Sequence, residues 1–292
     1  MTSTAAKRNS TPPGPTFALA LGGGGARGLA HIHAIEALDE LGIEPVAIAG
    51  SSIGSIMGAG MAAGMSGADI HHYAKSILGR RGEVASRIWK SRPGSLREAV
   101  SGGFRLGQFD IPRILKAFLP EAIPDTFEQL RIPLKVTGTD FYGHKAAVFE
   151  RGDLVSALAA SSAIPAVFRP VLRDGRYYID GGFYNPLPFD LLVGQADILI
   201  AIDVVGAPEG DPTVAPATLD LMFGTSQLMM QSIIETKLSQ RRPDIFLQPP
   251  VSKFRVLDFL KIDKVMRATA PLKDELKRAI DGAVAAHTAA SL

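Results

Sequence analysis

Short runs of apolar residues alternate along the chain with longer stretches in which apolar residues recur every three or four positions. The runs are typical of strands buried on both faces, and the longer stretches are typical of helices that cover them. The first elements follow in the order strand, helix, strand, helix, over residues 17–21, 27–41, 45–49 and 53–65. This order predicts a parallel sheet with helices on its faces.

The same alternation resumes towards the C-terminus. Further helices are predicted at 69–78, 153–160, 219–238 and 271–286, and further strands at 134–139, 176–179, 198–205 and 245–247. We therefore expect an α/β domain over residues 16–292, with a central, mostly parallel sheet flanked by helices. Residues 1–15 are polar and are expected to form a flexible N-terminal tail. Residues 80–130 interrupt the pattern and are interpreted as a possible cap or insertion.

Composition narrows the function classes. Apolar residues make up 46% of the chain and charged residues 21%, which is typical of a folded globular protein. The net charge of +2 gives no electrostatic argument for nucleic acid as a partner. The absence of cysteine excludes disulfides, thiolate catalysis and cysteine-ligated zinc. The N-terminal residues lack the apolar stretch of a secretory signal, so we expect a cytoplasmic protein.

A serine-containing turn is the strongest candidate for chemistry. The stretch Gly50-Ser51-Ser52-Ile53-Gly54 fits the pattern G-x-S-x-G, with an apolar strand before it and a helix after it. This context is typical of a nucleophile elbow, in which the serine stands on a tight turn and flanking glycines avoid steric clashes. The alternative is a Gly/Ser-rich turn that serves tight packing only.

A glycine loop follows the first strand, and three interpretations compete for it. The loop has the sequence Gly23-Gly24-Gly25-Ala26-Arg27-Gly28. A dinucleotide-binding loop would require an acidic residue at the end of the second strand, and a P-loop would require Gly-Lys-Ser/Thr; the sequence has neither. An oxyanion hole needs only backbone N–H groups that point to one place, and Arg27 would add positive charge. A salt bridge at the start of a helix is the alternative for Arg27.

A base for the serine is the third requirement. Asp180 ends a short strand and is followed by two glycines, which allow another group to approach closely. Asp140 and Asp203 also end apolar strands and remain rivals. Only His287 follows Asp180 in the chain, in a stretch of Ala and Thr, which argues against a Ser-His-Asp triad. Alternatively, Asp180 is an ordinary turn aspartate.

Taken in order over residues 17–205, these motifs resemble the patatin-like phospholipase family, and most closely its bacterial, neuropathy-target-esterase-like branch. The matching blocks are the glycine loop, the turn at Gly50, Ser52 and Gly54, the stretch 160–165, and Asp180-Gly181-Gly182. The resemblance implies a three-layer sandwich and a Ser52–Asp180 dyad, without a metal or another cofactor. It implies hydrolysis of a phospholipid, lysophospholipid or other fatty acyl ester. An acyltransferase and a non-catalytic regulatory module remain alternatives.

A basic segment suggests contact with a membrane. Residues 80–105 contain seven basic residues against two acidic ones, together with the single tryptophan, Trp89. Cations are attracted to anionic lipid, and tryptophan favours the headgroup region. One hypothesis is a lid that brings the protein to the inner membrane face, and the alternative is a solvated basic loop.

Overall fold

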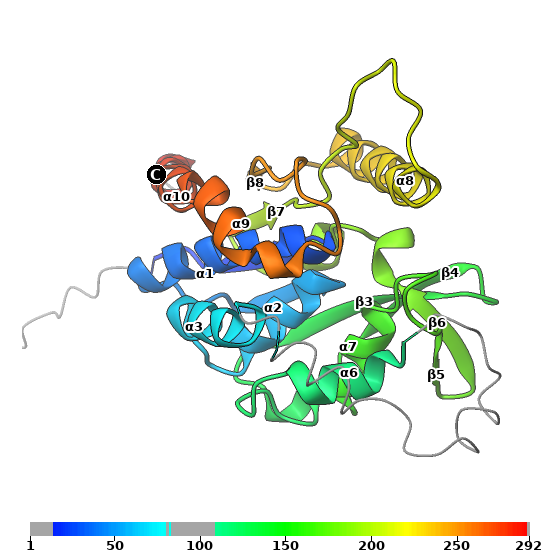
Figure 1. Ribbon diagram of the computed structural model, residues 1–292. Helices are drawn as coiled ribbons and strands as arrows, with labels where there is room; N and C mark the ends of the chain where they lie inside the picture. The colour runs from blue at the N-terminus through cyan, green and yellow to red at the C-terminus, as the bar shows by residue number, and fades with distance from the viewer. Residues whose placement is uncertain (1–13, 80–81, 83–108, 291–292) are drawn as a thin grey trace, which may run out of the picture.

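The computed structural model describes residues 14–79, 82 and 109–290 (Figure 1). The predictions for most of the N-terminal tail and for Trp89 with its basic segment lie outside these described residues. Within them, residues 109–130 pack into the main core through Ile111, Leu115, Ile123 and Phe127.

The sheet is mixed, with strand order β5-β6-β3-β2-β1-β7-β8 and with β4 also paired to β3. The parallel part consists of β1 (Phe17–Leu21), β2 (Ala47–Ser51), β3 (Leu134–Asp140), β7 (Ile198–Ile202) and β8 (Ile245–Leu247). The antiparallel part consists of β4 (Lys145–Phe149), β5 (Val171–Arg173) and β6 (Arg176–Asp180). The predicted fold class, an α/β protein with a central, mostly parallel sheet, is confirmed.

Helices cover the sheet on both faces. Alternate residues of β1 point to opposite sides, so that Leu19 and Leu21 join the larger core while Ala18 and Ala20 join the smaller one. The larger core is covered by α1 (His31–Glu40), α2 (Ile53–Ala62), α3 (Gly67–Leu78), α6 (Ile111–Phe118), α7 (Leu154–Ser161), α9 (Ile262–Thr269) and α10 (Pro271–Ala290). The smaller core is covered by η4 (Phe189–Leu192) and α8 (Thr218–Gln240), which stands apart from α1, α2 and α3 in Figure 1. The result is a three-layer sandwich.

The predicted elements are confirmed where apolar runs are long, and the missed elements are short or exposed. The strand predicted at 17–21 has the same bounds in the structure, whereas the helix predicted from residue 27 begins as a 3-10 turn, η1 (Gly25–Ala30), before α1. β4, β5, α6 and α9 were not predicted. β4 is largely exposed and β5 has three residues, so neither produces an apolar run.

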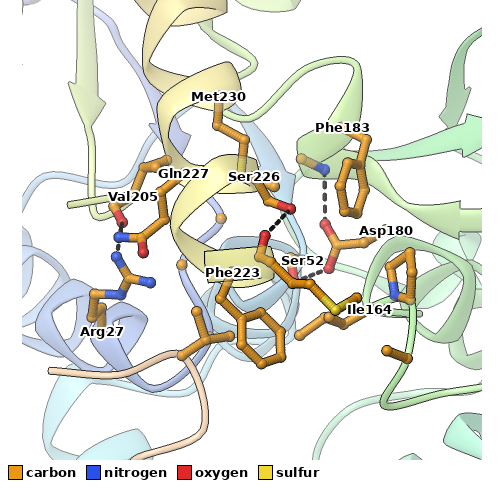
Figure 2. Close-up of a pocket in the computed structure, with 18 of the residues that line it drawn as sticks. Arg27, Ser52, Ile164, Asp180, Phe183, Val205, Phe223, Ser226, Gln227 and Met230 are labelled. Atoms are coloured by element: carbon orange, nitrogen blue, oxygen red, sulfur yellow. Dashed lines mark hydrogen bonds between the residues drawn. The ribbon is translucent and has the colours of Figure 1, made fainter. Parts of the chain in front are cut away.

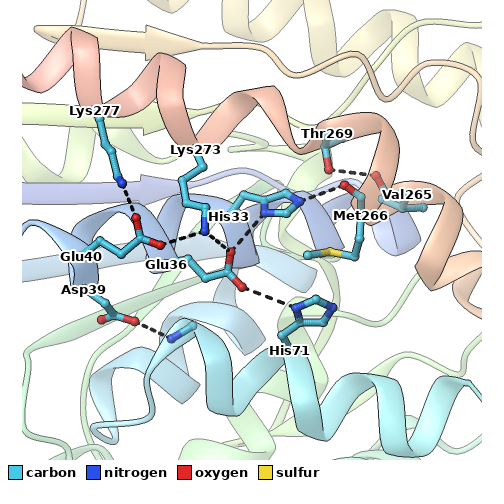
Figure 3. A network of polar contacts seen from close by, with 11 residues as sticks. His33, Glu36, Asp39, Glu40, His71, Val265, Met266, Thr269, Lys273 and Lys277 are labelled. Carbon is cyan, nitrogen blue, oxygen red and sulfur yellow. Dashed lines mark hydrogen bonds and ion pairs between the residues drawn. The ribbon is translucent and has the colours of Figure 1, made fainter.

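A polar network fixes the outer side of α1 (Figure 3). Glu36 accepts hydrogen bonds or ion pairs from His33 at 3.3 Å, from His71 of α3 at 3.4 Å and from Lys273 of α10 at 3.2 Å. Burial acts to raise the pKa of Glu36, but the hydrogen bonds from Lys273 and His33 outweigh it and hold the pKa below its usual value. These contacts link α1, the helix that follows the glycine loop, to α3 and to α10. In the part of the chain that the structure describes, no helix is long and apolar enough to cross a bilayer.

We expect Gly54→Ala to destabilise the protein by about 1–3 kcal/mol or more, because overpacking forces the backbone to shift. A Cβ atom at Gly54 would lie 2.2 Å from the carbonyl oxygen of Leu21, where α2 crosses the end of β1. Urea unfolding measures the change. The matched control is Gly282→Ala in α10, where a Cβ meets nothing within 4 Å. This control should gain up to about 1 kcal/mol from helix propensity. Equal effects of the two substitutions would contradict the close approach.

Candidate active site

Ser52 stands on a strained turn between β2 and α2. Its backbone has φ 51° and ψ −124°, a positive φ that costs a non-glycine residue about 1–3 kcal/mol. Two contacts hold the turn: the Ser52 N–H donates to Ser161 Oγ at 2.8 Å, and the Ser52 carbonyl accepts from Ser55 Oγ at 2.6 Å. A Cβ at Gly50 would lie 2.5 Å from the backbone of Ser55, so a glycine is required there. These features agree with the turn geometry predicted from the sequence.

Asp180 ends β6 and meets Ser52 directly (Figure 2). Ser52 Oγ donates to Asp180 Oδ2 at 2.6 Å, and the N–H of Gly182 donates to Asp180 Oδ1 at 2.8 Å. Asp180 is buried, with 3% of the residue exposed. Burial raises the pKa of Asp180 to about 6, although the hydrogen bonds from Ser52 and Gly182 act to lower it. A carboxylate in this environment can accept a proton close to neutral pH.

The register of β3 explains why these two residues meet. Thr137 of β3 pairs with Ser51 at the end of parallel β2, and the next residue, Gly138, pairs with Asp180 at the end of antiparallel β6. β6 therefore begins to pair with β3 where β2 stops, and the C-terminal ends of β2 and β6 approach each other. Residues 128 positions apart in the chain come within hydrogen-bonding distance for this reason.

The glycine loop divides into anchored and free N–H groups. The N–H of Gly22 donates to Ile202 O at 3.0 Å and that of Gly23 to Pro186 O at 2.9 Å. Among the described residues, no acceptor contacts the N–H of Gly24 or Gly25, and both glycines line a cavity with Ser52. A Cβ at Gly24 would lie 2.3 Å from Val204 O, and Gly25 has φ +59°. The loop therefore places two free donors beside the serine.

Two further residues, His31 and Gly28, help to hold the glycine loop in place. His31 Nε2 lies 2.8 Å from Gly22 O, and because a carbonyl only accepts, this nitrogen carries the proton. Burial lowers the pKa of His31 to about 4, so the ring is neutral. Gly28 packs against the side chain of Ile53 and lines no described cavity.

Arg27 is buried, and its guanidinium turns towards Val205 and Gln227 rather than towards Ser52 (Figure 2). Its Nη1 donates to the carbonyl of Val205. Desolvation lowers the pKa of Arg27 to about 10, against the opposing effect of nearby Asp203. The sequence predicted a charge at the oxyanion position; the structure places it at the side of the cavity.

The rival acids are occupied elsewhere. Asp140 pairs with Arg176 at 2.8 Å, and Asp203 accepts from the N–H of Val205 at 2.8 Å and from Gln248 at 2.7 Å. All six histidines lie among the described residues, and none lines the cavities at Ser52. Within the described residues, no group of three or more His, Asp or Glu is arranged to hold a metal ion.

Two cavities converge on Ser52, and both are lined by Gly25, Ser52 and Ile164. The smaller, of about 170 Å³, lies under α8 and is lined mainly by apolar side chains such as Phe223 and Met230, with Arg27 and Gln227 also in its wall. The larger, of about 450 Å³, is apolar and lies among α2, α3, α6 and the residues before α9. The sequence analysis did not predict that α8 or α6 contributes to the site.

The arrangement defines an α/β protein with a serine and a buried carboxylate paired at the junction of two cavities. Residues 19–193 match the family model of the patatin-like phospholipases, and the chain belongs to this family. It is 38% identical to an uncharacterized NTE family protein of Mycobacterium tuberculosis, over 78% of this chain and 61% of that protein. It is 28% identical to human patatin-like phospholipase domain-containing protein 6, over 86% of this chain and 19% of that protein.

Both relatives are longer than the part that this chain matches, which is about three fifths of the mycobacterial protein and one fifth of the human one. Among solved structures, the chain is similar to ExoU of Pseudomonas aeruginosa in complex with SpcU, at 15% identity and a TM-score of 0.46, over 94% of this chain and 53% of that chain.

We expect Asp180→Asn to stabilise the protein at pH 8. The pKa of Asp180 is raised in the folded state, so the folded protein holds this proton more tightly than the unfolded chain. The associated stability is present at low pH and is lost as the pH rises through about 6, by roughly 3 kcal/mol in total. Asparagine avoids that loss, so its advantage over wild type should be larger at pH 8 than at pH 4.

Urea unfolding at the two pH values tests this, with Asp203→Asn as the matched buried control. That control removes the charge beside Arg27 and should lose stability at pH 8. A stability difference between Asp180→Asn and wild type that does not change with pH would contradict the raised pKa.

Proposed function

We propose that the protein hydrolyses a fatty acyl ester of a lipid, with Ser52 as nucleophile and Asp180 as general base. The observation that carries the proposal is the 2.6 Å hydrogen bond from Ser52 Oγ to Asp180 Oδ2 at the meeting point of the two cavities. Membership of a phospholipase family, with lysophospholipase nte1 of Aspergillus niger among its relatives, supports a lipid as the substrate.

In the first half of the reaction, Asp180 Oδ2 takes the proton of Ser52 Oγ as this oxygen attacks the acyl carbonyl. The free N–H groups of Gly24 and Gly25 donate to the oxyanion, and fixed donors of this kind contribute about 2.7–4 kcal/mol each. Asp180 then passes the proton to the departing alcohol oxygen as the ester bond breaks. The acyl group remains on Ser52.

In the second half, water attacks the acyl-serine carbonyl and gives its proton to Asp180. The bond from the carbonyl carbon to Ser52 Oγ breaks, Ser52 recovers the proton, and the fatty acid leaves. The hydrogen bond from Gly182 holds the orientation of the carboxylate through both halves. One base with a pKa near 6 can accept and return the proton in each half.

The cavities suggest how the substrate is divided. A fatty acyl chain is apolar, and the larger cavity, of about 450 Å³, is lined by apolar side chains. We assign the acyl chain to this cavity. The smaller cavity, with Arg27 and Gln227 in its wall, is assigned to the departing alcohol.

A fluorophosphonate should label wild-type protein at Ser52 and should leave Ser52→Ala unlabelled, because the probe reacts with an activated serine. The labelling rate should rise about tenfold per pH unit below pH 6 and level off above it, as Asp180 ionises. Labelling and fatty acid release from phospholipids, lysophospholipids and glycerides are followed together. We expect release to fall roughly 10⁶-fold in Ser52→Ala, and by about 10²–10⁴-fold in Asp180→Asn, which removes the general base.

His287→Ala is the control for a Ser-His-Asp triad. It should retain the wild-type rates of labelling and hydrolysis, since His287 lies on α10 and does not line either cavity at Ser52. Wild-type hydrolysis by Ser52→Ala, or acyl transfer to an added alcohol at the expense of free acid, would contradict the proposed hydrolase.

Ala74→Phe should shorten the acyl chain that the enzyme accepts, because Ala74 of α3 lines the apolar cavity and a ring there occupies part of its volume. Each methylene that loses its place costs about 0.8 kcal/mol, or about fourfold in kcat/KM. Palmitoyl and butyryl esters of one alcohol are compared. The substitution should lower kcat/KM for the palmitoyl ester only. Ala286→Phe, on the exposed side of α10, should change kcat/KM for neither ester. Equal losses of kcat/KM on both esters would contradict the assignment of the acyl chain to the apolar cavity.

A further inference from the structure

A basic hollow lies between α9 and the segment that connects β8 to α9. It is an open depression of about 560 Å³, and the cations that line it are Lys253, Lys261, Lys264 and Arg267. No carboxylate of the described part of the chain lines it. The remaining lining residues are Phe254 and Ala268.

The acids near the hollow are paired, and most of its cations are not. Asp258 pairs with Lys261 at 2.8 Å, and Asp263 pairs with Lys75 of α3 at 3.0 Å. Within the residues that the structure describes, no carboxylate lies within ion-pair distance of Lys253, Lys264 or Arg267. Three cations of the hollow therefore have no direct ion pair among the described residues, although Arg267 also acts at longer range on Asp263.

Exposed apolar residues of the same segment and of the start of α8 lie at the edges of the two cavities. Leu257 and Leu260 are 47% and 46% exposed and line the apolar cavity. Leu219 and Met222, at the start of α8, are 62% and 50% exposed and line the smaller cavity. An ion pair of 3.2 Å between Arg255 and Asp220 joins the segment to α8. We call these four apolar residues the apolar rim.

We propose that the basic hollow and the apolar rim together form a docking surface for an anionic lipid bilayer. Proteins that lie on an anionic bilayer commonly present cations beside exposed apolar side chains. The apolar side chains enter the boundary of the acyl region, and the cations lie at the lipid phosphates. A soluble anion would account for the hollow but not for the rim. Docking in this way turns the openings of both cavities towards the lipid.

Two of the four cations stand on a helix that is fixed to the core. Ile262, Val265 and Met266 bury the inner side of α9, so Lys264 and Arg267 project from a helix that the core holds in place. Removing these charges should leave the fold and the reaction centre intact. The inference rests on the proposed function only in that a lipid hydrolase must reach a lipid surface, so binding and hydrolysis are measured separately.

The test is vesicle binding by protein carrying Ser52→Ala, with and without Lys253→Gln, Lys264→Gln and Arg267→Gln. Vesicles consist of phosphatidylcholine with or without phosphatidylglycerol, in low and high salt. A cation near an anionic surface contributes about fivefold, so the triple variant should bind anionic vesicles roughly 100-fold more weakly in low salt. The difference should shrink in high salt and on neutral vesicles.

The matched control removes three charges elsewhere, through Lys145→Gln, Arg241→Gln and Arg242→Gln. Lys145 lies on β4, and the arginines follow the far end of α8, which is about 34 Å long. The control should bind like its parent. With Ser52 restored, the triple variant should hydrolyse a short soluble ester at the wild-type rate, which separates docking from chemistry.

Three outcomes would overturn the proposal. Unchanged binding of anionic vesicles in low salt would do so directly. Calorimetric binding of inorganic phosphate that the triple variant loses, with vesicle binding unchanged, would make the hollow a site for a soluble anion. A change in oligomeric state in the triple variant, again with unchanged vesicle binding, would make the surface a contact between copies of this chain.

Discussion

The contact between Ser52 and Asp180 depends on one feature of the sheet, the change of partner along β3. Thr137 pairs with the end of β2 and Gly138 pairs with the end of β6, so two strand ends that run in opposite directions meet across a single step of β3. The carboxylate is delivered from inside the sheet rather than from a solvent-exposed loop. Its burial, its raised pKa and its short bond to the serine all follow from that position.

Ser52 and Asp180 each lower the stability of the folded state. Ser52 keeps a positive φ, and Asp180 is an acid withdrawn from water that contacts no cation among the residues the structure describes. The same two costs give the site its chemistry, because the strained turn exposes Oγ to the cavities and desolvation brings the carboxylate close to neutral pH. The surrounding structure fixes both, through Ser161 on the serine N–H and Thr139 on the carbonyl of Asp180.

The sequence was sufficient where the signal is local. An apolar strand followed by a glycine turn identified β1, β2 and the glycine loop, and a strand ending in Asp-Gly-Gly singled out Asp180 among its rivals only together with the family resemblance. Long-range pairing left no such signal. Nothing near Gly23 indicates that its N–H is bound to Pro186, and nothing near Arg27 indicates that its guanidinium turns to Val205. β4 was missed because an exposed strand lacks an apolar run.

Helix α8 shows the limit of pattern analysis most clearly. Of its 23 residues only Gly224 and Ile234 are buried, and apolar side chains occupy more than one side of it. Met222, Phe223 and Met230 line the smaller cavity, while Leu228 and Met229 are each 60% exposed. A helix of this kind has no clear apolar stripe, so its sequence does not indicate which side faces the protein.

The attachments of α8 explain how it can cover the site without sealing it. Asp220 pairs with Arg255 at the start of the helix, and near its end Lys237 donates to Leu187 O at 3.0 Å and to Asn185. The helix is therefore held at both ends, and its first half, from Leu219 to Met230, lines the cavity over Ser52. Methionine side chains are flexible and adapt to different neighbours. Rotation of Met222 and Met230 can thus change the space above Ser52 while the backbone of α8 stays in place.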